Sequence, residues 1–200
     1  MLFDKPGFRA VLLGFAALAA GACGPKDNAG TDTTGAMMGD TIGLAAQQTI
    51  APSWNDANIF ALLDATNVAD STHGMVASTK GTSAAVRDFG KQMMRDHHAM
   101  RVEGQALAKR LNVTPAPPPG DTLPAHAQKV SDMLNTTAKG KDFDKAYIDH
   151  QVEMHKGVLD IATKSMNAAQ STELKNMLQK AAPSVQAHLD KAQSIQRNMQ

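Results

Sequence analysis

The chain has 200 residues, with 20 Lys and Arg against 19 Asp and Glu, so its formal net charge is only +1. This balance offers no basic field for nucleic acid and no acidic surface for cationic partners. Aromatic residues make up 4% of the chain, whereas alanine and the 12 methionines are abundant. Such a composition favours helices packed by small and flexible side chains over a β-sheet, so we predict an all-α protein.

The N-terminus is expected to be a secretory signal peptide over residues 1–22. Lys5 and Arg9 precede an apolar run that is too short to span a bilayer as a mature helix. Small residues then lead to Cys23, the single cysteine, in a pattern that resembles the lipobox of bacterial lipoproteins. We therefore expect lipidation of Cys23 and anchoring in the bacterial envelope, on the periplasmic side, with Gly24 favouring the outer membrane. A conventional export signal with an incidental cysteine is the alternative.

Residues 23–52 are rich in Gly, Thr, Ala and Asp and show little periodicity. This composition is typical of a flexible tether. The remaining chain, residues 53–200, is long enough for one domain with its own hydrophobic core. We expect the membrane to be a partner through the lipid anchor, and no nucleic acid to bind.

Four long helices are predicted from apolar residues that recur at three-and-four spacing. In chain order, these apolar seams run from Ile59 to Ala77, Val86 to Leu111, Tyr147 to Met166 and Leu174 to Met199. The side chains expected to cap the helix starts are, in the same order, Ser53 or Asn55, Ser83, Asp142, and Ser171 or Thr172. Gly81 is expected to stop the first helix, and the second ends near Asn112.

The second and third long helices are separated by an extended connection. Its proline-rich segment 114–120 cannot continue a helix. A shorter helix then starts at Thr122, with Pro124 in its first turn, and reaches about Leu134. Four long helices with a long crossover between the second and third predict a ferritin-like four-helix bundle, with a short extra helix in that crossover. A simple up-and-down bundle is the alternative.

Three of the seven histidines, His97, His155 and His188, fall on the apolar seams of three different helices. An ionisable ring in such a position is costly unless something binds it. Asp70 and His73 could add a carboxylate and a fourth imidazole from the first helix, with Asp96 as a further ligand or as a residue that orients one. Because imidazole is a common ligand for iron, copper and zinc, the pattern predicts one transition-metal ion in the bundle core.

The remaining histidines, His98, His126 and His150, are expected to face solvent because they lie off the apolar seams. The alternative to a metal site is a non-catalytic envelope interaction or stress-related domain, in which the histidine and aspartate network only fixes the helix register. A ferritin-type di-iron centre needs Glu-x-x-His on two helices, and this motif is missing from the sequence. Phosphate-binding glycine loops, paired-cysteine zinc motifs and nucleophile elbows are missing too, so we assign no catalytic residue and no enzyme activity.

The chain resembles the domain-of-unknown-function 4142 (DUF4142) family over roughly residues 58–195. The matching pieces are Val86-Arg87-Asp88-Phe89 with Met93, Met94, Asp96 and His97; Phe143-Asp144-Lys145-Ala146-Tyr147-Ile148 with Gln151, Val152 and His155; and Pro183 with His188-Leu189. Where that family usually has a glutamate in the first helix, this chain has the shorter Asp70. The resemblance implies an exported bacterial protein with a ferritin-like fold, and it implies no particular reaction.

Overall fold

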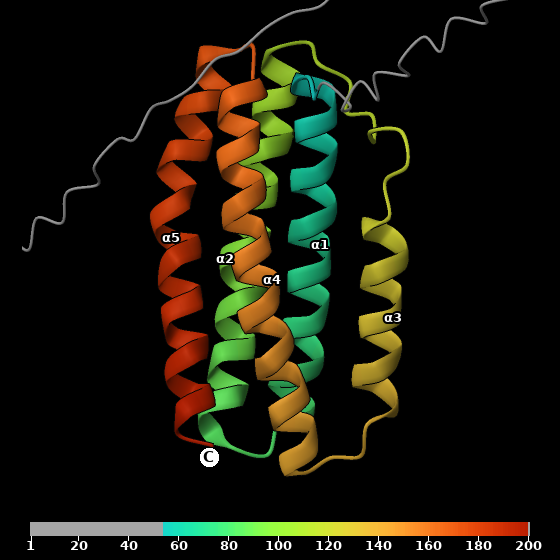
Figure 1. Cartoon of the computed structure of the whole chain (residues 1–200), viewed down its shortest axis with the longest axis vertical. Helices are drawn as coiled ribbons and strands as arrows, with labels where there is room; N and C mark the ends of the chain where they lie inside the picture. Colours follow the sequence, from blue (N-terminus) through green and yellow to red (C-terminus); the bar gives the residue numbers. More distant parts are fainter. Residues whose placement is uncertain (1–53, 200) are drawn as a thin grey trace, which may run out of the picture. The chain divides into compact units, whose positions relative to one another are not determined.

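The computed structural model describes residues 54–199, which form five helices and no strand. The helices are α1 (Asp56–Lys80), α2 (Ala84–Arg110), α3 (Leu123–Thr136), α4 (Lys141–Ala168) and α5 (Thr172–Arg197) (Figure 1). The all-α prediction is confirmed, and each helix covers nearly all of the seam or segment from which it was predicted. Leu111 and Met199, the last residues of two predicted seams, lie just beyond the ends of α2 and α5. The predicted signal peptide, Cys23 and the tether lie outside the described residues. Within the described part of the chain, none of the helices is both long and apolar enough to cross a membrane.

The helices form two hairpins, α1–α2 and α4–α5, joined by the crossover that contains α3 (Figure 1). Helices α1 and α5 run in one direction, whereas α2 and α4 run in the other. Because α2 and α4 are parallel, the connection between them has to return along the whole length of the bundle. This is the order of directions expected for a ferritin-like bundle, and α3 packs on α1 as the extra helix of the crossover.

Side chains at the helix starts explain where most of the helices begin. Asn55 and Asn58 form a reciprocal capping box at α1, with N···O distances of 3.0 and 3.3 Å. Ser83 and Ser171 cap α2 and α5. The predicted cap of α4 is wrong, because the N-cap is Gly140 and no side chain caps this helix, so Asp142 lies inside the first turn.

Two buried carboxylates hold the hairpins together at opposite ends of the bundle. Asp56 on α1 accepts hydrogen bonds from the backbone N–H groups of Gln170 and Ser171, at 2.7 and 3.0 Å. Asp144 on α4 accepts from the N–H groups of Thr82 and Ser83, at 2.7 and 2.8 Å. In each case a carboxylate of one hairpin binds the turn of the other hairpin. Both turns lead into the N-terminus of a helix, where a negative charge is favourable.

The hydrophobic core is divided into two clusters along the bundle. One is built around Phe89, Phe143 and Tyr147 near the α1–α2 turn. The other includes Ile59 and Leu174 near the α4–α5 turn. A layer of buried polar side chains, which carries the predicted metal ligands, lies between the two clusters. The fold therefore places these polar groups at mid-height, between two apolar clusters.

Candidate metal centre

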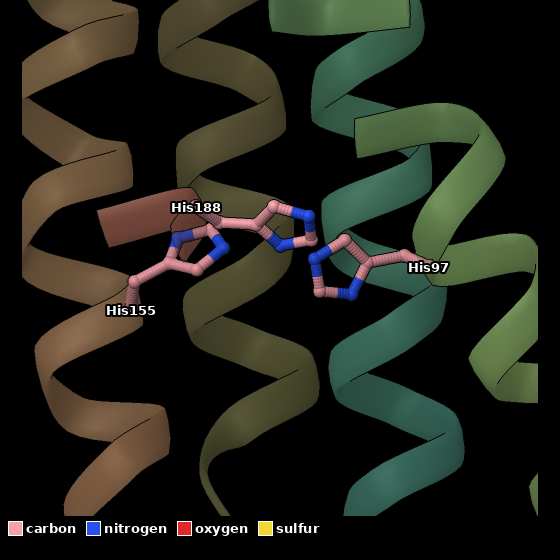
Figure 2. A group of neighbouring side chains, drawn as sticks. All are labelled: His97, His155 and His188. Atoms are coloured by element: carbon pink, nitrogen blue, oxygen red, sulfur yellow. The ribbon is translucent and has the colours of Figure 1, made fainter. Parts of the chain in front are cut away.

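Three histidine rings from three helices meet in the middle of the bundle. His97 comes from α2, His155 from α4 and His188 from α5, and Figure 2 shows the rings facing one another. One ring nitrogen of each histidine lies within 4.8 Å of those of the other two. All three side chains are buried, with at most 2% of their surface exposed. We call these three residues together with Asp70 the inner group.

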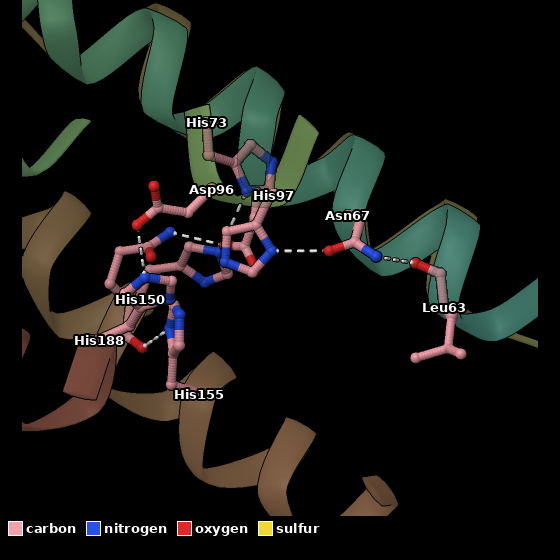
Figure 3. A network of polar contacts seen from close by, with 10 residues as sticks. Leu63, Asn67, His73, Asp96, His97, His150, His155 and His188 are labelled. Atoms are coloured by element: carbon pink, nitrogen blue, oxygen red, sulfur yellow. Dashed lines mark hydrogen bonds and ion pairs between the residues drawn. The ribbon is translucent and has the colours of Figure 1, made fainter. Parts of the chain in front are cut away.

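The orientation of His97 follows from its contact with Asn67 on α1. Nδ2 of Asn67 donates to the carbonyl of Leu63 at 2.8 Å, so its Oδ1 is the atom that faces the ring. Nδ1 of His97 therefore donates to that oxygen, at 2.8 Å (Figure 3). As a result Nε2 carries a lone pair, and this atom is buried without a hydrogen-bond partner.

His155 and His188 have the same arrangement, with different partners. Nδ1 of His155 donates to the carbonyl of Gln151 at 2.9 Å, which leaves Nε2 with its lone pair. Nε2 of His188 donates to Oδ2 of Asp96 at 2.9 Å, which leaves Nδ1 with its lone pair. Both of these remaining nitrogens are buried and unpaired. Each of the three rings thus donates its N–H to the surrounding protein and keeps one bare nitrogen.

Asp70 on α1 supplies an oxygen to the same layer. Its side chain is completely buried, and Oδ1 accepts a hydrogen bond from Nε2 of Gln151 at 3.1 Å. Oδ2 has no hydrogen-bond partner and lies 3.5 Å from Nε2 of His97. Three imidazole nitrogens and one carboxylate oxygen are therefore buried and unpaired at one level of the bundle. Leaving such groups unsatisfied costs about 1–3 kcal/mol each.

Burial keeps His97 and His188 in the form that can bind a metal. Desolvation lowers the pKa of His97, and the negative charge of Asp70 opposes part of this effect. Desolvation also lowers the pKa of His188, against the opposing influence of its hydrogen bond to Asp96. Both rings are therefore neutral at pH 7, and neutral imidazole is the species that ligates metal ions.

The residues of the inner group suit a divalent transition-metal ion. Two ligands on one tetrahedral ion of the zinc type lie about 3.4 Å apart, and His97 and Asp70 already have nearly this separation at 3.5 Å. The wider limit of 4.8 Å among the histidines means that these rings have to move inwards to reach a common ion. Nitrogen and oxygen donors of this kind suit zinc, copper(II) and iron(II).

The two remaining predicted ligands, Asp96 and His73, do not point to the centre of the inner group. Asp96 is one-third exposed and lies behind His188, so it orients that ring. His73 points to α3 instead, where its Nε2 lies 3.2 Å from both the carbonyl of Ala127 and Oγ of Ser131. His98 and His126 are exposed as expected.

The expectation that His150 faces solvent is wrong. Its side chain is half-buried, and its Nε2 lies 3.2 Å from Nδ1 of His73. The physical reason is α3, which packs beside α1 and α4 and covers the edge that periodicity alone leaves open.

Three further residues of this layer were not among the predicted ligands. Asn67 and Gln151 orient the inner group, and Tyr147 has a buried hydroxyl without a partner. Burial, together with the nearby charge of Asp70, raises the pKa of Tyr147 well above its usual value. In the sequence, Gln151 stands out only through the family resemblance, Tyr147 only through that resemblance and as part of an apolar seam, and Asn67 only as a polar residue on a mostly apolar helix.

A cavity of about 470 Å³ lies between the two hairpins and reaches the inner group from one side. Asn67 and His97 line it, together with apolar side chains that include Leu63, Met100, Ala162 and Val185. The cavity belongs to the half of the bundle near the α4–α5 turn.

Comparison with known proteins supports the fold and leaves the activity open. A family model described as "Domain of unknown function (DUF4142)" matches residues 42–195. The chain is also similar to the crystal structure of a DUF305 fragment from Deinococcus radiodurans, with a TM-score of 0.60 and 12% identity over 74% of this chain and 99% of the fragment. At this identity the likeness concerns the fold alone. A search of the curated proteins gave no match.

Proposed function

Because this chain belongs to the DUF4142 family, whose description assigns no activity, we propose its function from the site itself: it holds one divalent transition-metal ion in the bacterial envelope. The ligands are Nε2 of His97, Nε2 of His155, Nδ1 of His188 and Oδ2 of Asp70. Asn67, Gln151 and Asp96 keep these ligands in position.

One observation carries this proposal. Every histidine of the inner group donates one N–H outwards and leaves its other nitrogen buried and unpaired. A network that served only to fix the helix register would satisfy its own polar atoms, because each buried unpaired atom destabilises the fold. A bound cation satisfies all four lone pairs at once, and metal-binding histidines characteristically donate their second nitrogen to a carboxylate or carbonyl.

The ligand set favours holding an ion over catalysis. Structural zinc sites are closed by four protein ligands, whereas catalytic sites keep one position for water or substrate. With three imidazoles and one carboxylate the inner group has four protein ligands, so we propose that the domain buffers or carries the ion and assign it no reaction. Iron, copper(II) and zinc all suit these donors.

Location is the second part of the proposal. The sequence pattern before Cys23 supports export and lipid anchoring, and residues 23–52 have the composition of a tether. We therefore propose that the bundle acts on the periplasmic side of the envelope, attached by a lipid on Cys23. A Cys23→Ser variant should move from the membrane fraction to the soluble periplasmic fraction, and retention in the membrane would contradict the anchor.

Metal content tests the central claim. The chain without residues 1–22, and with Cys23→Ser, is purified without chelators and analysed for bound elements. We expect one equivalent of transition metal, and an increase in stability of about 2.7 kcal/mol when the free ion is at 100 times its Kd. The exposed His98→Gln variant is the matched control and should bind one equivalent as well.

The His155→Gln variant separates metal binding from a purely structural network. If the proposal holds, this variant loses most of the stabilisation by added zinc, copper(II) or iron(II), while His98→Gln keeps it. If the histidines are only structural, His155→Gln lowers the stability of the metal-free protein, and added metal does not distinguish it from the parent. That second outcome, or the absence of any stoichiometric metal in the parent, would remove the proposal.

A further inference from the structure

A second group of histidines lies beside the inner group, on the side of the bundle covered by α3. His73 from α1, His126 from α3 and His150 from α4 form this outer group. The rings of His73 and His150 are 5.0 Å apart between centroids, and those of His126 and His150 are 6.3 Å apart. Figure 3 shows His73 and His150 next to the inner histidines. Nothing in the proposed function uses these three residues.

Two nitrogens of the outer group have the separation of two ligands on one ion. Nε2 of His73 donates towards the carbonyl of Ala127, so its Nδ1 carries a lone pair. That nitrogen lies 3.2 Å from Nε2 of His150. Nε2 of His150 donates a hydrogen bond to this lone pair, so a cation would have to replace that proton, and the two rings would have to turn until both nitrogens face the ion. Neighbouring ligands on a tetrahedral zinc-type ion are about 3.4 Å apart, so the separation of the two nitrogens would change little. His126 is exposed, and its ring centroid lies 6.3 Å from that of His150.

Burial increases step by step through the outer group. His126 is exposed, His150 is half-buried and His73 is only 1% exposed. Imidazoles therefore extend from the surface on α3 to the interior face of α1. A cation that moves along them exchanges one nitrogen ligand for the next.

Asp70 connects the outer group to the inner one. It precedes His73 by one helical turn on α1, and its Oδ1 accepts a hydrogen bond from Gln151, the residue that follows His150. The charge of Asp70 acts on His73 and His150 as well as on His97 and His188. One carboxylate is thus shared between the two groups of rings.

The cavity between the hairpins is a less suitable route for a cation. Its lining is mostly apolar and includes Leu63 and Ala162, although Asp64, Glu103 and Asp121 also line it. A divalent cation that crossed the apolar part of this lining would lose hydration there without compensation, which is unfavourable.

We propose that His73, His126 and His150 form a second, weaker binding site for a divalent transition-metal ion, through which the ion reaches the inner group. This inference rests on the proposed function, because the ion is taken to end at the inner group. It assigns to α3 a functional role, since α3 carries the exposed member of the outer group and closes the site over α1.

Loading kinetics test this route. Metal-free protein is mixed with Co²⁺ in a stopped-flow instrument, and occupation of the inner group is followed by the visible absorption of tetrahedral Co²⁺. The double variant His126→Gln/His150→Gln should load at least tenfold more slowly than the parent and lose the weaker second equivalent. Its affinity at the inner group should stay within about threefold of the parent value, because the inner ligands are unchanged.

Two controls define the alternative outcomes. His98→Gln removes an exposed histidine elsewhere on the bundle, and Ala162→Phe obstructs the cavity; both should load at the parental rate. The single variant His126→Gln changes only an exposed side chain, so it tests the route without disturbing the interior. An unchanged loading rate in both the single and the double variant, or slow loading caused by Ala162→Phe, would overturn the inference. If even the parent fails to bind at the inner group, the proposed function fails with it.

Discussion

Asn67 shows how much of the site depends on one uncharged side chain. Its amide bridges the carbonyl of Leu63 and Nδ1 of His97, and so decides which nitrogen of that ring faces the interior. A residue that holds a ligand in this way typically contributes 10–100-fold to metal affinity.

The first prediction therefore concerns Asn67→Ala. This variant should weaken metal binding at the inner group by about 10–100-fold while the number of ions bound at that group stays at one. The measurement is competition against a chromophoric chelator. Asn135→Ala is the control, because Asn135 is exposed on α3 and its contact with Lys80 uses the backbone carbonyl, which alanine keeps. Equal losses in the two variants would contradict the role given to Asn67.

The second prediction concerns pH. Desolvation lowers the pKa of His150 to about 4, from an ordinary value of 6.5, and it also lowers the pKa values of His73, His97 and His188. Between these two values the unfolded chain binds more protons than the folded one, so stability is fully present above pH 6.5 and falls as the pH drops towards 4. His150 alone contributes at most about 2 kcal/mol to this loss at pH 5.

Urea unfolding of the metal-free protein at pH 7.5 and pH 5 measures this effect. The His150→Gln variant should lose less stability between the two pH values than the parent does, because its position 150 cannot be protonated. The exposed His98→Gln variant should keep the parental difference. A parent protein that was more stable at pH 5 would contradict the assignment of these rings as buried and neutral.

At the scale of single residues, the sequence was enough to predict that the three histidines of the inner group face the interior. It did not predict which residues bind them. His97, His155 and His188 lie on apolar seams, and helical periodicity is enough to turn such positions inwards. His73 and His150 were misplaced because α3 covers α1 and α4, which gives α1 a second buried face. The roles of Asn67 and Gln151 depend on distances between helices that no spacing along one helix contains.

At the scale of the elements, α1 and α2 approach each other closely at Gly74 and Gly90. A Cβ atom added to Gly90 would lie 2.7 Å from the carbonyl oxygen of Gly74 and 2.8 Å from the backbone nitrogen of Ser78. Both neighbours are backbone atoms, so the helices would have to separate. This contact holds Asp70 and His97, one on each helix, at the same level.

The third prediction is that Gly90→Ala lowers the free energy of unfolding by about 1–3 kcal/mol, because two rigid helices have to move apart. Gly157→Ala is the matched control: Gly157 is exposed within α4 and a Cβ there meets nothing within 4 Å. Alanine at that position should raise stability by up to about 1 kcal/mol through helix propensity. Chemical denaturation measures both, and two changes of the same sign would contradict this account.

Most helix boundaries could be predicted because their signals are local. Ser83 and Ser171 act through hydrogen bonds to backbone groups three residues away, so their effect depends on a short stretch of sequence. The start of α4 could not be predicted in this way. Its first turn carries Asp142, which is exposed, and Asp144, which is turned to the other hairpin, and the sequence does not distinguish these two carboxylates.

At the scale of the whole molecule, the inner group draws Asp70 and His97 from one hairpin and His155 and His188 from the other. A bound ion would therefore join the two hairpins at mid-height, between the contacts of Asp56 and Asp144 at the two ends. The bundle topology could be predicted from the proline-rich crossover, since a long connection permits α2 and α4 to run in parallel. The contacts of Asp56 and Asp144 with the turn of the other hairpin could not be predicted, because they link residues more than 60 positions apart in the sequence.

The fourth prediction concerns these two end contacts. Asp144→Ala and Asp56→Ala should each lower stability by about 2–3 kcal/mol, because each leaves two backbone N–H groups without a charged acceptor. The two contacts lie at opposite ends of helices that are about 37 Å long, so their effects should add within about 0.5 kcal/mol in the double variant. Asp142→Ala, an exposed change in the same turn as Asp144, should cost less than about 0.5 kcal/mol.

The matching contacts of Asp56 and Asp144 with the opposite turns indicate an approximate two-fold axis that relates the α1–α2 hairpin to the α4–α5 hairpin. Asn67 follows Asp56 by the same eleven residues that separate His155 from Asp144, so an amide on one side corresponds to an imidazole on the other. His97 likewise corresponds to Val185, each fourteen residues after its capping serine. The arrangement of the helices is nearly symmetric, but the polar side chains at the centre of the bundle are not. The α1–α2 hairpin and the α4–α5 hairpin therefore present different side chains to the centre.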